Sequence, residues 1–343
     1  MRVKINMLKI KKWYINFIEK KEKSLGGSFF YYFLCFLSYV YGGIIVLRNF
    51  FYDKNIFRQY ALDATVISIG NLSWAGSGKT SLSLWLYERL SPTNRLAILR
   101  RGYGDDEHKL LAEVSSNVFS SPDRYQIAKE CESLFDVFIL DDGFQYRRLK
   151  RDINILIMGA REFRKKYQLI PAYFFREPFS AIKRADIVLL NYVDEINDPS
   201  EIKKNILKIA PHLKIYFSRY RVRGFSDLKG NKYAINFLKG KKVAALSAIG
   251  YPEGFFDKLK ELNLEVSEQI TYPDHYELPE KEFMRIERRL LSAGIKDLII
   301  TRKDKYHLPA VNSNINIFIM DVNIEIENED DFLDVILNCL KKK

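Results

Sequence analysis

Short apolar segments alternate with helical segments along most of the chain beyond residue 60. The apolar segments predict buried strands, and the segments between them, with apolar residues at helical spacing, predict helices. The strands expected in the first part are Val66–Ile69, Leu96–Leu99, Val137–Leu140, Ile153–Met158 and Ile187–Leu190, and the clearest helices are Lys79–Leu90 and Tyr125–Phe135. This alternation is typical of an α/β fold with a doubly wound, mostly parallel sheet.

A second alternating set follows an irregular region rich in Lys, Arg, Gly and Tyr. It predicts a second, smaller α/β domain with elements at Val243–Leu246, Glu253–Leu262, Val266–Ile270, Pro279–Ser292, Leu298–Thr301, Ile315–Met320 and a helix from Asp330. The expected divisions are a basic N-terminal arm (1–28), a membrane-associated helix and connector (29–60), the larger core (61–210), a linker or ribbon (211–240) and the smaller domain (241–343).

The first strand leads into a loop of small residues that ends in Ala75-Gly76-Ser77-Gly78-Lys79-Thr80. Glycines let backbone N–H groups approach phosphate oxygens, and the N-terminus of the following helix adds partial positive charge. Lys79 is expected to reach the β- and γ-phosphates, and the Thr80 hydroxyl to bind Mg²⁺. The strict phosphate-loop pattern has Gly where this chain has Ser73, and a glycine-rich turn is the alternative. The predicted ligands are a nucleoside triphosphate and Mg²⁺.

Two carboxylates, Asp141 and Asp142, end the strand candidate Val137–Leu140. In phosphate-loop enzymes such a strand lies beside the loop strand, and its terminal Asp holds Mg²⁺ directly or through water. Two carboxylates suggest a metal ligand together with a residue that positions water or substrate. A simple turn after a strand is the alternative.

A charged segment, Arg100 to His108, follows the strand Leu96–Leu99. Because carboxyl ends of parallel strands face the ligand crevice, these charges should lie near the phosphates. Arg101 could neutralise γ-phosphate charge, and Asp106 could take a proton from an acceptor hydroxyl. On composition alone, a polar surface loop is an equal alternative.

The N-terminal region combines basic and apolar residues. Residues 5–18 fit a helix on an anionic membrane surface or a solvated basic arm equally well. Phe29–Leu47 carries no charge and could just span a bilayer. A true span would retain the basic arm in the cytoplasm and export the remainder, whereas the phosphate loop needs cytoplasmic ATP. We therefore prefer an anchor on the cytoplasmic side over a span, with a buried soluble helix third.

The net charge of +12 suits an acidic partner such as nucleic acid, anionic lipid or a phosphorylated substrate. No nucleic-acid recognition module is present in the sequence, and no obligate protein partner is predicted. The three cysteines are far apart and odd in number, which fits a reducing cytoplasm and suggests neither a disulfide framework nor a zinc site.

Several motifs in this order resemble the tetraacyldisaccharide 4'-kinase family, over roughly residues 45 to 305. They are Leu47-Arg48-Asn49 with Tyr52-Asp53, Ile67 to Ser73 with Gly76 to Thr80, Arg101 to Gly104, Asp123-Arg124-Tyr125, Leu140 to Gln145 with Arg147, Arg151-Asp152, Pro171 with Arg176-Glu177-Pro178, Ala185-Asp186, Pro273-Asp274-His275, and Thr301 with Lys303-Asp304. The Leu-Asp-Asp-Gly-Phe-Gln and Arg-Glu-Pro pieces are the most specific.

The resemblance implies a P-loop NTPase-type kinase that transfers the ATP γ-phosphate to the 4'-hydroxyl of an acylated disaccharide phosphate glycolipid, giving lipid IVA. It implies that the enzyme acts on its lipid substrate at the membrane surface, on the cytoplasmic face of a bacterial inner membrane. By motif, ATP is bound by Ser73, Trp74, Ala75, Gly76, Ser77, Gly78, Lys79 and Thr80. Asp141 and Asp142 belong to the Mg²⁺ and phosphate site, with Asp141 preferred as the metal ligand and Asp142 joining Lys79 in the catalytic set; which of the two carboxylates touches the metal stays open. Asp106 matches the family's catalytic Asp, with His275 supporting it from the smaller domain. Arg101, Gln145 and Arg176 are the candidates for substrate or phosphate contacts.

The chain departs from the family pattern at four places. The spacing between Arg-Gly-Tyr-Gly and the catalytic Asp motif is much shorter, which leaves Asp105 and Asp106 as alternatives for the base. Tyr146, Tyr173 and Ala248 replace a His and two Gly residues. These departures suggest a divergent substrate pocket.

Two other functions are compatible with parts of the sequence. Asn191-Tyr192-Val193-Asp194 is similar to the guanine-reading motif of GTPases and related metallochaperones, although Tyr192 replaces the Lys that stacks on the base. A membrane-tethered nucleotide-binding scaffold without catalysis is the second alternative.

Overall fold

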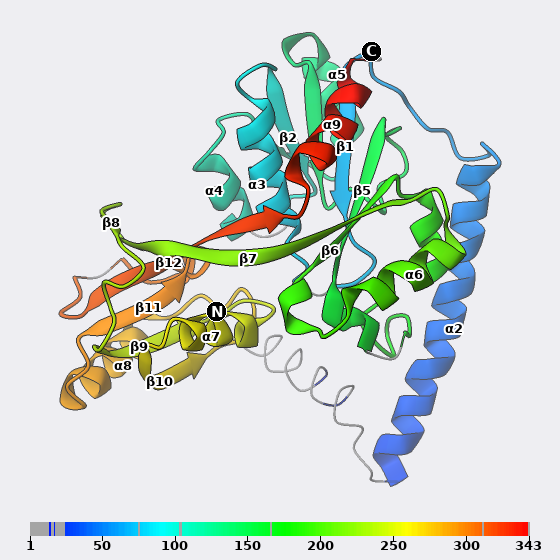
Figure 1. Ribbon diagram of the computed structural model, residues 1–343. Coiled ribbons are helices and arrows are strands. Elements are labelled where there is room, and N and C mark those ends of the chain that lie inside the picture. Colours follow the sequence, from blue (N-terminus) through cyan, green and yellow to red (C-terminus); the bar gives the residue numbers. More distant parts are fainter. Residues whose placement is uncertain are drawn as a thin grey trace. The chain divides into compact units, whose positions relative to one another are not determined.

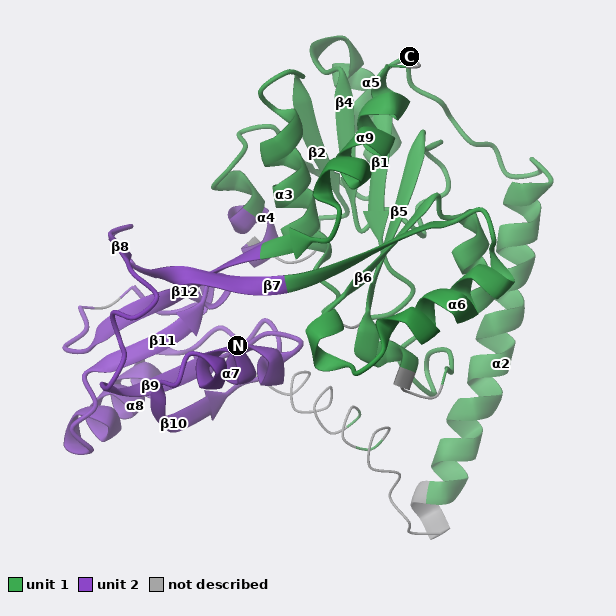
Figure 2. Ribbon diagram, in the orientation of Figure 1, with its two compact units in different colours: residues 1–103, 111–219, 324–343 green, residues 104–110, 220–323 purple. Residues whose placement is uncertain are grey.

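The computed structural model describes Tyr14, Phe17 and residues 25–74, 76–102, 105–164, 167–310 and 312–341 (Figure 1). Most of the predicted basic arm, and Ala75 of the phosphate loop, lie outside the described residues. The chain divides into two compact units (Figure 2). Unit 1 comprises Met1–Tyr103, Leu111–Arg219 and Ile324–Lys343, and unit 2 comprises Gly104–Leu110 and Tyr220–Asn323.

Unit 1 is built on a parallel sheet with the strand order β3-β2-β4-β1-β5-β6-β7. Its strands are β1 (Thr65–Gly70), β2 (Leu96–Arg100), β3 (Val118–Ser120), β4 (Val137–Asp141), β5 (Ile153–Gly159), β6 (Ile187–Asn191) and the first part of β7 (Lys214–Asp227). Its helices are α2 (Leu25–Asp53), α3 (Lys79–Leu90), α5 (Arg124–Cys131), α6 (Pro199–Ile209), α9 (Glu329–Leu340), and the 3-10 helices η1 (Glu132–Leu134), η2 (Ala160–Arg164), η3 (Phe179–Arg184) and η4 (Val193–Glu195).

Every residue of β1, β2, β4, β5 and β6 is buried. Continuous burial is expected for parallel strands that are covered on both faces, so the predicted doubly wound α/β sheet is confirmed. The chain starts at β1, adds β2, β3 and β4 on one side of it, and then crosses to β5 and β6 on the other. This reversal creates a topological switch point at the carboxyl ends of β1 and β4, where open α/β sheets bind ligands.

The C-terminal helix α9 belongs to unit 1, whereas the sequence placed residues 324–343 in the smaller domain. Phe332 explains the difference, because its side chain is fully buried and packs edge-on against Trp85 and Tyr216 of unit 1. The Tyr216 hydroxyl also donates a hydrogen bond to Asp331 at 2.5 Å. One buried aromatic ring removes enough apolar surface from water to hold a short helix in place.

Unit 2 contains a parallel sheet with the order β10-β9-β11-β12. Its elements are β8 (Lys232–Tyr233), β9 (Lys242–Ser247), α7 (Pro252–Glu261), β10 (Glu265–Thr271), α8 (Glu280–Ser292), β11 (Asp297–Thr301), η5 (Asp304–His307), most of β12 (Asn316–Ile326) and most of α4 (Asp105–Ala112). Alternate residues of these strands belong to two separate hydrophobic clusters. One cluster includes residues of α8, and the other includes residues of α7. The expected linker or ribbon is the long strand β7, whose end pairs with β8 in antiparallel register.

Helix α2 presents an apolar face that unit 1 leaves uncovered. From Ser28 to Asp53 the helix is long and apolar enough to cross a membrane, yet only 17% of its most apolar window is buried. We call the following exposed residues the open face of α2: Phe29, Phe30, Tyr32, Phe33, Phe36, Tyr39, Val40, Ile44, Val46, Leu47 and Phe50. A buried soluble helix, the third alternative from the sequence, does not agree with this exposure.

The opposite face of α2 is fixed to unit 1 by hydrogen bonds. Ser38 Oγ donates to the carbonyl of Leu169 at 2.9 Å, and the Tyr41 hydroxyl donates to the carbonyl of Arg176 at 2.8 Å. The helix is therefore held to the rest of unit 1 by hydrogen bonds on one side, and its other side is apolar and exposed.

Candidate active site

The phosphate loop connects β1 to α3 at the switch point of the sheet. Gly70 ends β1 where a Cβ atom would come within 2.6 Å of the Phe144 backbone nitrogen, so only glycine fits there. Gly78 is the N-cap of α3, and its φ of 94° lies in the left-handed region that glycine adopts without strain. The helix begins at Lys79, so its first backbone N–H groups and its partial positive charge face the loop.

Two buried asparagines support this loop, and the sequence analysis assigned neither of them to the site. Asn71 Nδ2 donates to Ser77 Oγ at 3.0 Å, and Asn191 Nδ2 donates to the Ser77 carbonyl at 3.0 Å. Asn71 comes directly after the buried strand β1, and Asn191 is the last residue of the buried strand β6. A polar residue at the end of an apolar strand is the sequence feature by which both could have been predicted. The Asn191 amide is thus used inside the protein, where it supports the loop.

The two carboxylates at the end of β4 lie in different environments. Asp141 is 3% exposed and accepts a hydrogen bond from Ser83 Oγ at 2.9 Å. Asp142 is only partly buried, with a φ of 51° that turns it away from the strand. Arg176 donates to both Asp142 oxygens at 3.0 and 2.9 Å, and Lys79 Nζ lies 3.8 Å from one of them.

Two positively charged side chains, Lys79 and Arg176, therefore lie next to the Asp142 carboxylate. Burial opposes ionisation of this carboxyl, but the charges of Lys79 and Arg176 hold its pKa below the usual range. Gln145 joins the same group, because its Nε2 donates to the Asn71 carbonyl at 2.9 Å and its Oε1 lies 3.5 Å from Arg176. The structure thus brings together Lys79, Asp142, Gln145 and Arg176, all of which the sequence predicted for the site.

The remaining predicted loop residues have different exposures. Ser73 and Ser77 are buried, Lys79 and Thr80 are half-buried, and Trp74 and Gly76 are exposed. Arg101 is exposed at the end of β2, and Ala75 lies outside the described residues.

Tyr146, which replaces the usual His, has a defined structural task. Its hydroxyl donates to Asp123 at 3.0 Å and accepts from the Tyr125 backbone N–H at 3.1 Å. The Arg124 guanidinium lies 3.9 Å from the centre of the Tyr146 ring and donates to the Asp142 carbonyl at 3.3 Å. Tyr146 therefore positions an arginine beside the carboxylate pair.

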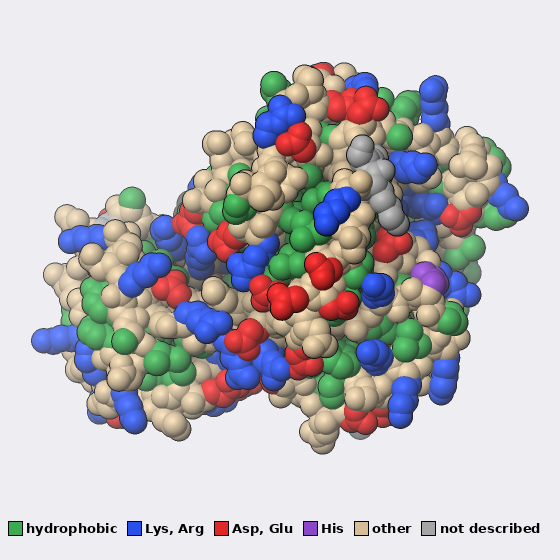
Figure 3. Space-filling model, turned by 45° about the horizontal axis from the view of Figure 1, so that its top comes forward, with side chains coloured by type: hydrophobic (Ala, Val, Ile, Leu, Met, Phe, Trp, Pro, Cys, Tyr) green, Lys and Arg blue, Asp and Glu red, His purple; other side chains and the backbone are tan. Residues whose placement is uncertain are grey.

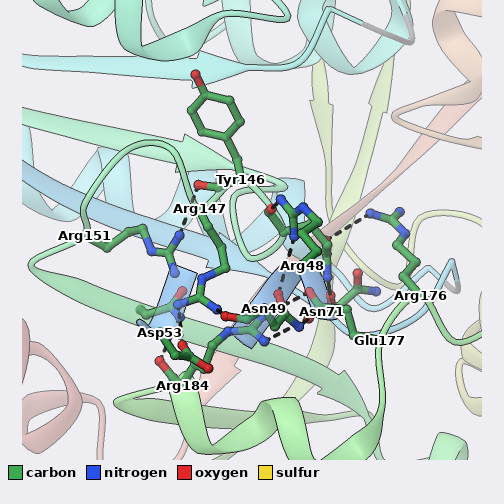
Figure 4. Close-up of polar contacts among 12 residues, drawn as sticks. Arg48, Asn49, Asp53, Asn71, Tyr146, Arg147, Arg151, Arg176, Glu177 and Arg184 are labelled. Carbon is green, nitrogen blue, oxygen red and sulfur yellow. Dashed lines mark hydrogen bonds and ion pairs between the residues drawn. The ribbon is translucent and has the colours of Figure 1, made fainter. Parts of the chain in front are cut away.

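A network of arginines joins the end of α2 to this edge of the sheet (Figure 4). Arg48 donates to the Gln145 carbonyl at 2.8 Å, and Arg147 donates to Asp53 at 2.6 Å. Burial beside two further guanidinium groups lowers the pKa of Arg151 to about 10. Glu177, which is completely buried, balances part of this charge by accepting from Asn49 at 2.8 Å and from Arg184 at 2.8 and 3.0 Å.

Asp106 lies in unit 2, within a cluster of histidines and charged groups. Asp106 is 3% exposed, His275 Nδ1 lies 3.0 Å from its Oδ2, and His307 Nε2 lies 3.2 Å from the same oxygen. Lys303 Nζ is also 3.3 Å from this oxygen. The sequence placed Asp106 in the larger core and His275 in the smaller domain, but the structure groups residues 104–110 with unit 2, so both belong to one unit.

Several interactions keep Asp106 ionised. Burial opposes its charge, but hydrogen bonds with His275 and His307 and the charge of Lys303 together hold its pKa well below the usual range. His275 has a φ of 62°, an uncommon value for a non-glycine residue, and its backbone N–H donates to the Ala248 carbonyl at 3.2 Å. Ala248 is fixed in turn by Asp304, whose carboxylate accepts from its N–H at 2.8 Å. His307 and Lys303 were not assigned to the site from sequence.

Charged side chains of both signs occur side by side on the face of the protein shown in Figure 3. On that face the net positive charge is thus spread among acidic groups and does not form one continuous basic surface.

A parallel α/β sheet with a glycine-capped helix, a lysine and paired carboxylates at its switch point defines a phosphate-loop nucleotide-binding protein. The sequence comparisons agree. The family model for tetraacyldisaccharide-1-P 4'-kinase matches residues 30–118 and 106–341. The tetraacyldisaccharide 4'-kinase of Aquifex aeolicus is 34% identical over 325 residues, covering 85% of this chain and 94% of the relative. That of Halothermothrix orenii is 27% identical over 374 residues, covering 96% of this chain and 97% of the relative.

Among solved structures, LpxK from Aquifex aeolicus in complex with ATP matches with a TM-score of 0.69 and 30% identity, over 89% of this chain and 97% of that one. The chain belongs to the tetraacyldisaccharide 4'-kinase family. It is an ATP-dependent kinase of lipid A biosynthesis, as its motifs predicted.

Glu177→Ala should lower the free energy of unfolding by roughly 3–5 kcal/mol, because it leaves the Arg184 guanidinium without its buried partner. The measurement is denaturant unfolding of the detergent-solubilised protein. Asp136→Ala is the matched control, since Asp136 also pairs with an arginine, Arg95, but at the surface, and it should leave the unfolding midpoint nearly unchanged. Equal effects of the two substitutions would contradict the role of Glu177.

Proposed function

We propose that this chain transfers the γ-phosphate of ATP to the 4'-hydroxyl of a tetraacylated disaccharide 1-phosphate, with the phosphate loop binding the nucleotide and Asp106 receiving the acceptor proton. The convergence of Lys79 and Arg176 on Asp142 beside the phosphate loop is the observation that carries this proposal. Phosphoryl transfer needs mainly positioning and neutralisation of charge, and these groups supply both.

The residues at the loop also fit Mg²⁺. This cation prefers oxygen ligands and keeps several waters, so one hydroxyl and one carboxylate suffice. Thr80 on the first turn of α3 and Asp141 at the end of β4 offer those oxygens, and the Ser83 hydrogen bond orients the Asp141 carboxylate. Bound there, Mg²⁺ would offset phosphate charge. Lys79 and Arg176 would contact the phosphoryl oxygens directly, with Arg101 and Gln145 as further contacts.

The low pKa of Asp106 suits a group that orients the acceptor hydroxyl and accepts its proton late in the transfer. In a loose transition state the attacking oxygen keeps its proton until bond formation is advanced, so a strong base is not required. His275 holds the carboxylate in one orientation and offers an imidazole nitrogen 3.0 Å away to share the proton.

The open face of α2 supports work at a membrane surface. A contiguous row of exposed aromatic and aliphatic side chains is unusual for a soluble surface and suits the interface with lipid. Because α2 is hydrogen-bonded to unit 1 near Arg176, this placement would hold the nucleotide site close to an acylated substrate. We infer attachment to the cytoplasmic face of the inner membrane.

Lys79→Ala should lower ATP-dependent phosphorylation of tetraacyldisaccharide 1-phosphate in detergent micelles by roughly 10²–10³-fold, since a cation on the transferred phosphate is lost. Transfer of label from γ-labelled ATP to the glycolipid measures this. GTP hydrolysis without lipid phosphorylation, or nucleotide binding without turnover in the unmodified protein, would favour a GTPase or a scaffold.

Asp106→Asn should lower kcat by roughly 10²–10⁴-fold while ATP binding changes little, because the substitution removes the proton acceptor and leaves unit 1 intact. Asp105→Asn is the neighbouring control and should retain most of the activity. If Asp105→Asn produces the loss instead, the base is Asp105.

Replacing Phe29, Phe33 and Phe36 together by Ser should move the protein from the membrane fraction to the soluble fraction, because the apolar area on the open face of α2 is lost. Leu134, Leu228 and Ile235 are exposed apolar residues elsewhere, and their replacement by Ser is the control. Flotation with liposomes quantifies binding, and equal binding of both triple variants would refute the role of α2.

A further inference from the structure

The three groups around Asp106 have the chemistry of a transition-metal site. In the part of the chain that the structure describes, Asp106, His275 and His307 form the one set of three metal-ligating side chains whose donor atoms all lie within 4.8 Å of one another. Two imidazole nitrogens and one carboxylate are ligands that suit zinc and its neighbours, whereas Mg²⁺ prefers oxygen alone. The nucleotide site in unit 1 is therefore chemically different from this one.

Two of the three ligand-to-ligand distances fit a tetrahedral ion. Ligand atoms about 2.0–2.1 Å from zinc in tetrahedral geometry lie roughly 3.3 Å apart. His275 Nδ1 and His307 Nε2 lie 3.0 and 3.2 Å from Asp106 Oδ2, and all three donor atoms lie within 4.8 Å of one another. The Asp106 and His307 side chains are 3% and 9% exposed, which shields two of the three ligands from water.

A second carboxylate, that of Asp274, lies beside the other ring nitrogen of His275. His275 Nε2 lies 3.4 Å from an Asp274 carboxylate oxygen. Metal-binding histidines commonly donate their other ring N–H to a carboxylate, which fixes the tautomer and raises ligand basicity. Asp274 therefore lies where it can accept the Nε2–H when Nδ1, which shares a hydrogen bond with Asp106 in the metal-free protein, binds a metal instead.

The charge of the cluster favours a divalent cation as well. Lys303 lies 3.3 Å from Asp106, 3.2 Å from Asp274 and 3.8 Å from Glu107. Three carboxylates and one ammonium leave a formal charge of −2 when both imidazoles are neutral, and a divalent ion cancels it. The ion pairs with Asp274 and Glu107 can hold the Lys303 ammonium group in place when the Asp106 carboxylate binds a metal.

We propose that Asp106, His275 and His307 bind one Zn²⁺ ion, and that the bound ion inhibits the kinase by occupying the Asp106 carboxylate. Binding itself is independent of the reaction, whereas the inhibition rests on the proposed role of Asp106 as proton acceptor. Zinc would then act as a reversible inhibitor that leaves the nucleotide site untouched.

The test measures Zn²⁺ binding to the full-length protein in detergent by isothermal titration calorimetry, with Cys35, Cys131 and Cys339 replaced by Ser so that thiolates do not contribute. One ion should bind per chain. His307→Asn should weaken binding by roughly 10- to 100-fold or more, since it removes a direct ligand. His212→Asn is the control, because His212 lies in unit 1 near the carbonyl of Ala185, and it should bind zinc as tightly as the parent.

Activity then separates the two parts of the proposal. With Mg²⁺ and ATP in excess, Zn²⁺ should inhibit the parent and His212→Asn proteins, and the rate that His307→Asn retains should not fall. Binding that survives His307→Asn unchanged overturns the site. Zinc binding that needs His307 but leaves the rate unchanged keeps the site and overturns Asp106 as the proton acceptor.

Discussion

Charge balance at Asp142 is the interaction on which the larger unit depends. A phosphate loop needs cations close together at the carboxyl edge of the sheet, and such cations repel one another unless a carboxylate lies between them. Asp142 supplies that negative charge to Lys79 and Arg176. The turn after β4, Gln145 and the Arg-Glu-Pro segment are all arranged around this contact. The phosphate contacts that we propose and the local charge balance thus use the same side chains.

The same principle extends from the site to helix α2. Guanidinium groups from Arg147, Arg151 and Arg184 lie near the end of α2, Arg147 buried and the other two half-buried, and Glu177 and Asp53 balance part of their charge. Arg147 pairs with Asp53 of α2, so separation of α2 from the rest of unit 1 would leave the buried Arg147 guanidinium without that carboxylate. The apolar open face of α2 therefore has a fixed relation to the phosphate loop within that unit.

In unit 2, the Asp106 carboxylate is held by a different set of contacts. Asp106 is surrounded by two imidazoles and an ammonium group, and backbone contacts at Ala248 keep His275 in its uncommon conformation. For the proton transfer that we propose, a carboxylate that is ionised and fixed before substrate binds needs no reorganisation. The same fixed geometry gives the cluster its resemblance to a metal site.

The sequence by itself determined the order of strands and helices, the phosphate loop and the carboxylate pair, because apolar periodicity and glycine chemistry are local properties. It also indicated Asp106 with His275 and the apolar character of α2. The tertiary structure alone decided that Asn71 and Asn191 support the loop, that His307 and Lys303 join Asp106, that α9 packs on unit 1, and which face of α2 stays open. These contacts join residues distant in the chain, and whether a polar side chain is a partner or a surface group depends on what folding buries beside it.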